Sequence, residues 1–171
     1  MGRVRTLAAL LLGALSLTLV VAAPSEASIK AGADQTIEQG MISLVNAYRA
    51  QHGLPALKAN PALMRAARFH SHDMADNGYF DHTSPDGEQF FQRLTRFGFH
   101  WLSAGEAIGE ASGLTSPTDA ASSAFTMWRE SPPHNKIMLT GSYRSVGIGA
   151  WCGSDAGDGA TCTFTLDAAR S

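Results

Sequence analysis

The chain has 171 residues, and its 13 Lys and Arg against 15 Asp and Glu give a formal net charge of −2 at pH 7. This length fits one domain preceded by a short leader. The sequence contains no basic stripe with interleaved aromatic residues, which argues against a nucleic-acid partner. It also contains no polybasic run that would predict attraction to a membrane surface.

The N-terminus has the pattern of a secretory signal peptide. Two arginines precede an apolar run over 7–23, and small residues follow up to Ala27. An uncleaved membrane anchor is the less favoured alternative, because the run is shorter than the ~20 residues of a spanning helix. We therefore expect a secreted, extracellular protein with no integral membrane segment after cleavage. The expected organisation is a signal peptide at 1–27, a short lead-in at 28–35 and a single domain at 36–171.

Apolar residues at helical spacing predict four helices. The first begins near Thr36 and ends around His52. The second follows Asn60, a side-chain cap with proline at the next position, and ends at Gly78. The third is expected to open at Ser84-Pro85 and to bury Phe90, Phe91, Leu94 and Phe97, and the fourth to run from Ser116-Pro117 through Trp128.

Two strand-like runs, 146–152 and 161–166, close the chain around a turn rich in Gly and Asp. Helices followed by strands, without a repeating βαβ order, indicate the α+β class. Cys152 and Cys162 flank this turn, and an exported chain meets oxidising conditions. We therefore predict a cross-strand disulfide worth ~2–3 kcal/mol. A catalytic cysteine is the less favoured alternative.

Three polar residues interrupt apolar surroundings and are candidate site residues. His82 follows an aromatic pair, Glu106 lies within an apolar run, and His134 follows a double proline. Two imidazoles and a carboxylate could ligate Zn²⁺ or another divalent ion. Their wide spacing is not diagnostic, so a buried structural carboxylate remains the default interpretation of Glu106. His70, on the apolar stripe of the second helix, is likewise expected to be a hydrogen-bonded core residue.

Five short motifs occur in a fixed order, and together they resemble a known family. They are Ala-Tyr-Arg, Phe-Asp-His, Gly-Glu-Ala-Ile-Gly, Trp-Arg-Glu-Ser-Pro-Pro-His and Val-Gly-Ile-Gly. Over 37–166 the chain resembles the CAP superfamily (SCP domain), which includes cysteine-rich secretory, antigen 5 and pathogenesis-related proteins, and is most similar to its bacterial secreted branch. The resemblance implies a three-layer α-β-α sandwich with an antiparallel sheet and a central cleft lined by two histidines and two acids.

The family residues map onto this chain one by one, with two departures. His82 and His134 match the two cleft histidines, and Glu106 matches the acid of the family's Gly-Glu-Asn motif. Ala107 replaces the asparagine of that motif, which removes an amide that would help to order the cleft wall. Only Glu130 is a candidate for the second acid, and its register is shifted relative to animal and plant relatives.

The resemblance favours an extracellular binding or interaction module whose cleft holds a divalent metal such as Zn²⁺, a lipid, a peptide or a cell-wall component. The absence of a Ser or Cys nucleophile with a partnered base points the same way. The alternative is a metal-assisted hydrolase of peptide or cell-wall material, in which Glu106 polarises a metal-bound water. A third hypothesis treats His82, Glu106 and His134 as a structural network. Asn46 and Arg49 match a first-helix family pattern, and we expect them to be structural, through backbone hydrogen bonds and a buried pair.

Overall fold

The computed structural model describes residue 29, residues 31–154 and residues 159–171. The expected signal peptide at 1–27 lies outside the described residues. No helix in the described part of the chain is both long and apolar enough to cross a membrane. In chain order the elements are β1 (Gly32–Ala33), α1 (Gln35–Gln51), β2 (Lys58–Ala59), α2 (Pro61–Asn77), α3 (Phe90–Arg96), β3 (Ser103–Leu114), α4 (Pro117–Glu130), α5 (Pro132–Met138), β4 (Ser145–Ser154) and β5 (Ala160–Arg170).

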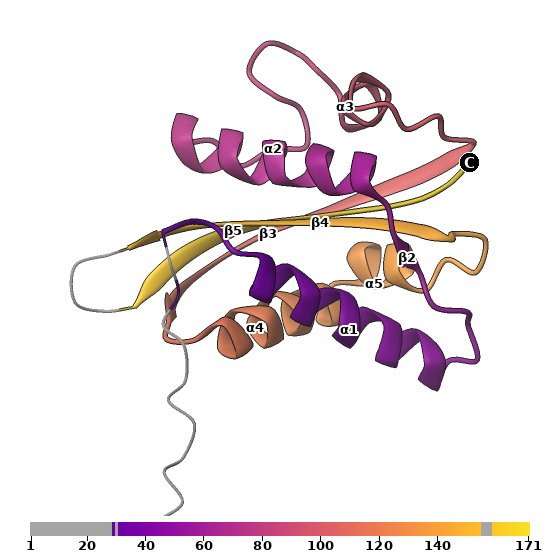
Figure 1. Ribbon diagram of the computed structural model, residues 1–171, viewed down its shortest axis with the longest axis horizontal. Helices are drawn as coiled ribbons and strands as arrows, with labels where there is room; N and C mark the ends of the chain where they lie inside the picture. The colour runs from indigo at the N-terminus through magenta and orange to yellow at the C-terminus, as the bar shows by residue number, and fades with distance from the viewer. Residues whose placement is uncertain (1–28, 30, 155–158) are drawn as a thin grey trace, which may run out of the picture.

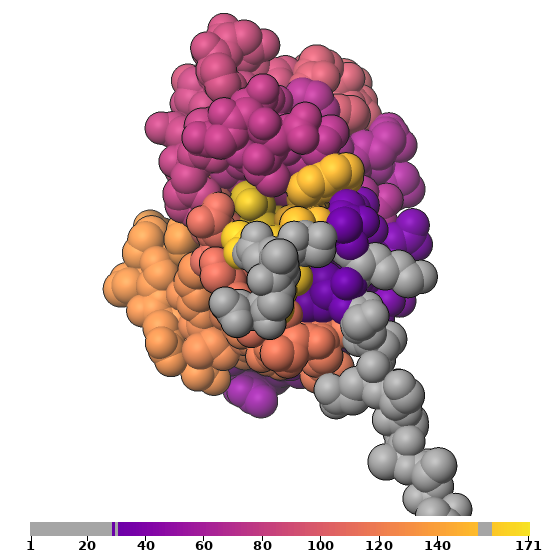
Figure 2. Space-filling model, turned by 90° about the vertical axis from the view of Figure 1, so that its left-hand side faces the viewer, coloured from indigo at the N-terminus to yellow at the C-terminus, as the bar shows by residue number. Residues whose placement is uncertain are grey.

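One five-stranded sheet separates two layers of helices. The strand order is β1-β4-β5-β3 with antiparallel neighbours, and the two-residue β2 pairs with β4 in parallel. Helices α2 and α3 lie on one face, and α1, α4 and α5 lie on the other (Figure 1). Figure 2 shows the same layering from one end, with α2 above the strands and α4 below them. The expected α-β-α sandwich is therefore confirmed.

Side-chain caps set the starts of the long helices; those of Asn60 and Ser116 were predicted from the sequence, and that of Asp34 was not. The carboxylate of Asp34 accepts hydrogen bonds from two backbone N–H groups of α1. Asn60 does the same for α2, with Pro61 at the first position, and Ser116 caps α4. Gly78 ends α2 in the left-handed conformation, at φ 65°, which glycine adopts without steric cost. The predicted ends of α1 and α2 therefore agree with the structure to within about one residue.

Two segments differ from the expectation. The third helix begins at Phe90 and not at Ser84, because Ser84 is engaged in a turn whose backbone bonds reach Gly87 and Glu88. Phe91 is exposed instead of buried. A short fifth helix, α5, follows the four that were predicted, because both prolines occupy its first turn, where no N–H donor is needed.

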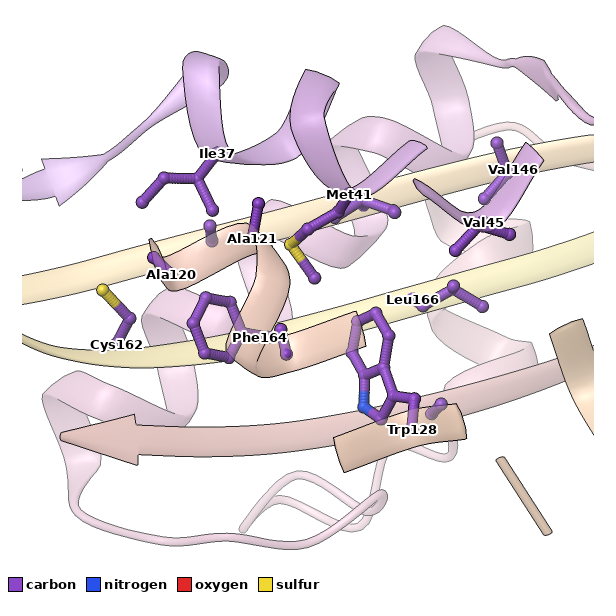
Figure 3. Packing of buried hydrophobic residues seen from close by; sticks show 14 of the residues in the cluster. Ile37, Met41, Val45, Ala120, Ala121, Trp128, Val146, Cys162, Phe164 and Leu166 are labelled. Carbon is purple, nitrogen blue, oxygen red and sulfur yellow. The ribbon is translucent and has the colours of Figure 1, made fainter. Parts of the chain in front are cut away.

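The main core lies between the sheet and the α1/α4 layer (Figure 3). Trp128 of α4 is fully buried, and its indole N–H donates to the carbonyl of Ile108 at 3.1 Å. Met41, Phe164 and Leu166 belong to the same cluster. A smaller cluster under α2 and α3 contains Leu63, Ala66, Leu94, Phe99 and Ala169.

The predicted disulfide is present. Cys152 and Cys162 are directly paired across β4 and β5, with a Cα–Cα distance of 4.1 Å. The bridge therefore joins the two strands beside the hairpin connection, where a short loop is closed.

Two residues of α1 hold neighbouring loops by backbone hydrogen bonds, as expected. Asn46 both donates to and accepts from the backbone of Leu57, at 3.0 and 2.8 Å. The buried guanidinium of Arg49 donates to the carbonyls of Pro55, Met138, Thr140 and Tyr143. The expected buried pair of Arg49 is not seen: no described carboxylate forms an ion pair with this guanidinium. These bonds fix α5, and with it His134, to α1.

Glycines of β4 allow α2 to lie directly on the sheet. A Cβ atom on Gly147 would come within 2.1 Å of the Leu63 carbonyl carbon, and one on Gly149 within 2.4 Å of that of Ala67. Real Cβ atoms do not approach a backbone so closely, so any side chain here would push α2 away from the sheet.

We predict that Gly149→Ala destabilises the protein by about 3 kcal/mol, because the added methyl group meets helix backbone that cannot move without repacking α2. Gly153→Ala is the matched control, since it lies on the same strand and its Cβ would meet nothing within 4 Å. Urea unfolding of both variants checks this. Equal losses in the two variants would contradict it.

Candidate functional site

The buried carboxylate of Glu106 on β3 is the centre of a polar network. Its Oε1 accepts a hydrogen bond from His82 Nδ1 at 2.8 Å, and its Oε2 accepts one from Arg93 Nη2 at 2.8 Å. Burial alone would raise the pKa of Glu106, but the hydrogen bond from His82 and the charge of Arg93 outweigh it and lower that pKa. Glu106 is therefore a carboxylate with both oxygens engaged.

Arg93 ties the loop that carries His82 to this carboxylate. It lies on α3 and is fully buried. Besides Glu106, its guanidinium donates to the Ser84 hydroxyl at 3.1 Å and to the His82 carbonyl at 3.2 Å. One side chain thus joins α3, the loop between α2 and α3, and the edge strand β3.

His82 is the half-exposed member of the network, with 48% of its side chain accessible. Its Nδ1 bonds Glu106, which leaves Nε2 as the ring nitrogen for solvent or a ligand. The hydrogen bond with Glu106 raises the pKa of His82, although burial opposes the shift. His82 therefore favours the charged imidazolium more than an ordinary histidine does.

His134, on the short helix α5, lies near His82 and has the opposite tendency. Burial and the positive charge of His82 lower the pKa of His134. Its Nδ1 is buried without a hydrogen-bond partner among the described residues. The structure thus joins His82 to Glu106 directly and brings His134 within electrostatic range of His82. The spacing of these residues in the chain did not predict either contact.

Glu130 does not lie with these residues. It is the last residue of α4, is exposed, and pairs with Arg129 at 3.6 Å. It lines a separate hollow of about 460 Å³ with Ser122, Ser123, Thr126 and Met127. The acidic residue that accompanies Glu106 in the structure is a different one.

That residue is Asp167 of β5, the direct cross-strand neighbour of Glu106. Asp167 is fully buried, and within the described chain the polar group that its carboxyl faces is the Glu106 carboxylate and not an N–H donor. Burial and the nearby charge of Glu106 raise the pKa of Asp167 well above its usual value. The signal that could have found it is alternation, since Thr163, Thr165 and Asp167 form a polar series at every second position of a buried strand.

His70 of α2 is buried, as predicted, but it also borders the network. Its Nε2 lies 3.9 Å from Glu106 Oε1, and its Nδ1 lies 3.5 Å from the hydroxyl of Tyr79, which donates to Asp73. Burial lowers the pKa of His70 to about 4, so its ring is neutral at pH 7. Among the described residues, the buried side-chain polar atoms without partners belong to His70, Arg93, His134 and Asp167. Three of these four residues, His70, Arg93 and Asp167, directly neighbour Glu106.

The expected metal-ligand set of His82, Glu106 and His134 is not assembled as three free donors. In the described part of the chain, no group of three or more His, Cys, Asp or Glu side chains is arranged to hold a metal ion. Glu106 is occupied by His82 and Arg93. The two imidazoles remain as nitrogen donors, and Glu106 orients one of them.

Comparison with known proteins gives consistent matches. Residues 42–164 match the model of the cysteine-rich secretory protein family, CAP. The protein YkwD of Bacillus subtilis is 34% identical over 112 residues, which cover 66% of this chain and 41% of that protein. The chain therefore spans about two fifths of the length of this relative.

Two solved structures have a similar fold. An extracellular protein of Bacillus anthracis that contains an SCP domain superposes with a TM-score of 0.65 at 27% identity, covering 79% of this chain and 40% of that one. An outer surface protein of Borrelia burgdorferi superposes with a TM-score of 0.66 at 14% identity, covering 86% of this chain and all of the other. At 14% identity, the similarity to the Borrelia burgdorferi protein concerns the fold alone.

We predict that Glu106→Gln destabilises the protein by about 3–5 kcal/mol, because it leaves the buried charge of Arg93 without its partner. The control is the double variant Glu106→Gln with Arg93→Met, which removes both charges and should recover much of the loss. Denaturant unfolding measures both. A double variant no more stable than the single one would argue against this pair as the cause.

The opposed pKa shifts of the two histidines give a second prediction. NMR titration should show His82 titrating above 6.5 and His134 below it. Because the pKa of His82 is raised on folding, its contribution to stability is complete below about pH 6.5 and is lost as the pH rises through the raised value. His82→Ala should therefore cost more stability at pH 5.5 than at pH 8.5. An equal cost at the two pH values would contradict the linkage.

Proposed function

The chain belongs to the cysteine-rich secretory protein (CAP) family, and from that premise we propose that it is an extracellular binding module and not a hydrolase. The observation that carries the proposal is the engagement of both Glu106 oxygens, by His82 and by Arg93. The description of the Bacillus anthracis protein as extracellular supports the location.

A hydrolytic role for Glu106 fits this geometry poorly. A general base must accept a proton from a water molecule that it contacts. The Glu106 carboxylate is buried, and each oxygen already accepts a hydrogen bond from a neighbour that stabilises the charged form. A catalytic zinc also takes three protein ligands as a rule, whereas this site offers two imidazoles. Both arguments favour binding over turnover.

We propose that His82 and His134 contact the ligand through a shared divalent cation. Glu106 fixes the ring of His82 by bonding Nδ1, the arrangement that metal-ligating histidines commonly have with a carboxylate. Imidazole pairs suit Zn²⁺ among the common divalent ions. With two protein ligands, the remaining positions are left for donor groups of the ligand, such as a carboxylate or phosphate of a peptide, lipid or cell-wall component.

Calorimetric titration of the metal-stripped protein with Zn²⁺ tests this proposal. We expect binding near one equivalent that weakens at least about tenfold in His134→Ala, whereas His52→Ala, an exposed histidine on α1's C-cap, leaves it unchanged. Affinity should fall as the pH falls below the raised pKa of His82, because a metal ligand must lose its proton.

Three outcomes would count against the proposal. If the parent protein shows no binding heat, the proposed divalent cation is ruled out. If His134→Ala binds Zn²⁺ as the parent does, the cation binds at another place. Zinc-dependent cleavage of a peptide or cell-wall substrate that is lost in a folded Glu106 variant would restore the hydrolase hypothesis.

A further inference from the structure

Four chain segments meet at one end of the sheet, and three of them bring exposed cations there that form no ion pair with a described carboxylate. Backbone hydrogen bonds run from Lys58 N to the Arg144 carbonyl, from Arg144 N to the Ala169 carbonyl, and from Leu102 N to the Arg170 carbonyl. Lys58, Arg144 and Arg170 therefore occupy adjacent strand ends. This is the right-hand end in Figure 1, where the C-terminus is marked.

One acidic side chain from outside these segments reaches this end: Glu88, which pairs with Arg96. The segments that meet there, 52–65, 96–104, 136–146 and 168–171, contain no Asp or Glu. Lys58, Arg65, Arg144 and Arg170 are exposed, and none of them forms an ion pair with a described carboxylate. The chain as a whole is slightly acidic, so the positive charge is segregated to this end and is not a property of the whole surface.

The same end exposes apolar side chains. Of the four large exposed hydrophobic residues in the described chain, three gather here: Phe91, Trp101 and Leu102 are 37%, 38% and 69% accessible. The indole N–H of Trp101 donates to the Phe91 carbonyl at 3.1 Å, and their rings meet edge to face at 5.8 Å. Leu102 is one residue further on and carries the backbone bond to Arg170.

We propose that this basic–aromatic end, defined by Lys58, Arg144, Arg170, Trp101 and Leu102, docks on an anionic lipid bilayer. Lys and Arg beside exposed Trp, Phe and Leu are the composition of protein surfaces that lie in the membrane interface. The negative surface potential of the bilayer attracts the cations, and the head-group region accepts the aromatic and aliphatic side chains. A soluble polyanion would pair with the cations but leave Leu102 in water, which is why the bilayer is the better match.

Co-sedimentation with vesicles tests the proposal. We expect the protein to bind vesicles of phosphatidylcholine with phosphatidylglycerol, not phosphatidylcholine alone, and to release as salt screens the charges. Arg170→Ala should weaken binding about fivefold, as for the loss of one cation near a charged surface. Leu102→Ser should weaken it about tenfold through loss of apolar burial. Melting curves near that of the parent would establish that each variant is folded.

Two matched control variants remove the same kinds of side chain, a cation and an exposed apolar group, from other parts of the surface. Arg129→Ala removes an exposed cation that is paired with Glu130, and Phe80→Ser removes an exposed apolar side chain outside this end. Both should bind vesicles like the parent protein.

The proposal is overturned if the controls weaken binding as much as Arg170→Ala and Leu102→Ser, or if anionic and neutral vesicles bind alike. Equal binding to soluble dextran sulfate with no effect of Leu102→Ser would assign the surface to a polyanion instead. These outcomes are independent of the Zn²⁺ titration, because neither His82 nor His134 belongs to the basic–aromatic end.

Discussion

The buried carboxylate of Glu106 is the constraint on which the rest of the site depends. It lies on an edge strand, and its two bonds reach a loop residue and a helix residue that precede it in the chain. Helix α3 has only seven residues, too few to be stable without tertiary contacts. The ion pair between Arg93 and Glu106, together with the packing of Leu94, therefore fixes α3 and the loop that carries His82.

The protonation states around Glu106 follow from one rule, that the interior tolerates a charge only beside its partner. Arg93 and His82 supply positive charge on either side of the carboxylate. His70 is too deeply buried to carry a further positive charge, and its pKa is lowered to about 4. Asp167 faces the same carboxylate from the neighbouring strand, so its own negative charge is disfavoured. The Glu106 anion is thus retained, a negative charge on Asp167 is disfavoured, and His70 is neutral at pH 7.

The sequence predicted the parts of this protein that local rules determine. The caps Asn60 and Ser116, and the disulfide across the hairpin, depend on residues close in the chain or on the redox environment. Strand β3 was not predicted, because its many small residues and its two carboxylates, Glu106 and Glu110, carry no clear alternation. Arg93 and Asp167 were missed for a related reason: each becomes part of the site only through a long-range contact or through the register of β3 against β5. Glu130 was selected by its place near Trp128, and the structure shows it exposed at a helix end.

The basic–aromatic end shows the same dependence on register, with a consequence for the site. No run of basic residues marks it in the sequence, since Lys58, Arg144 and Arg170 are separated by dozens of residues and meet only where the strand ends align. Along the sheet, the pair Ser103 and Arg170 stands three positions from the pair Glu106 and Asp167. At ~3.3 Å per residue this is about 10 Å. A domain docked on a bilayer by that end would therefore hold His82 and the Glu106 network close to the head groups, where an anionic ligand presented by the surface could reach them.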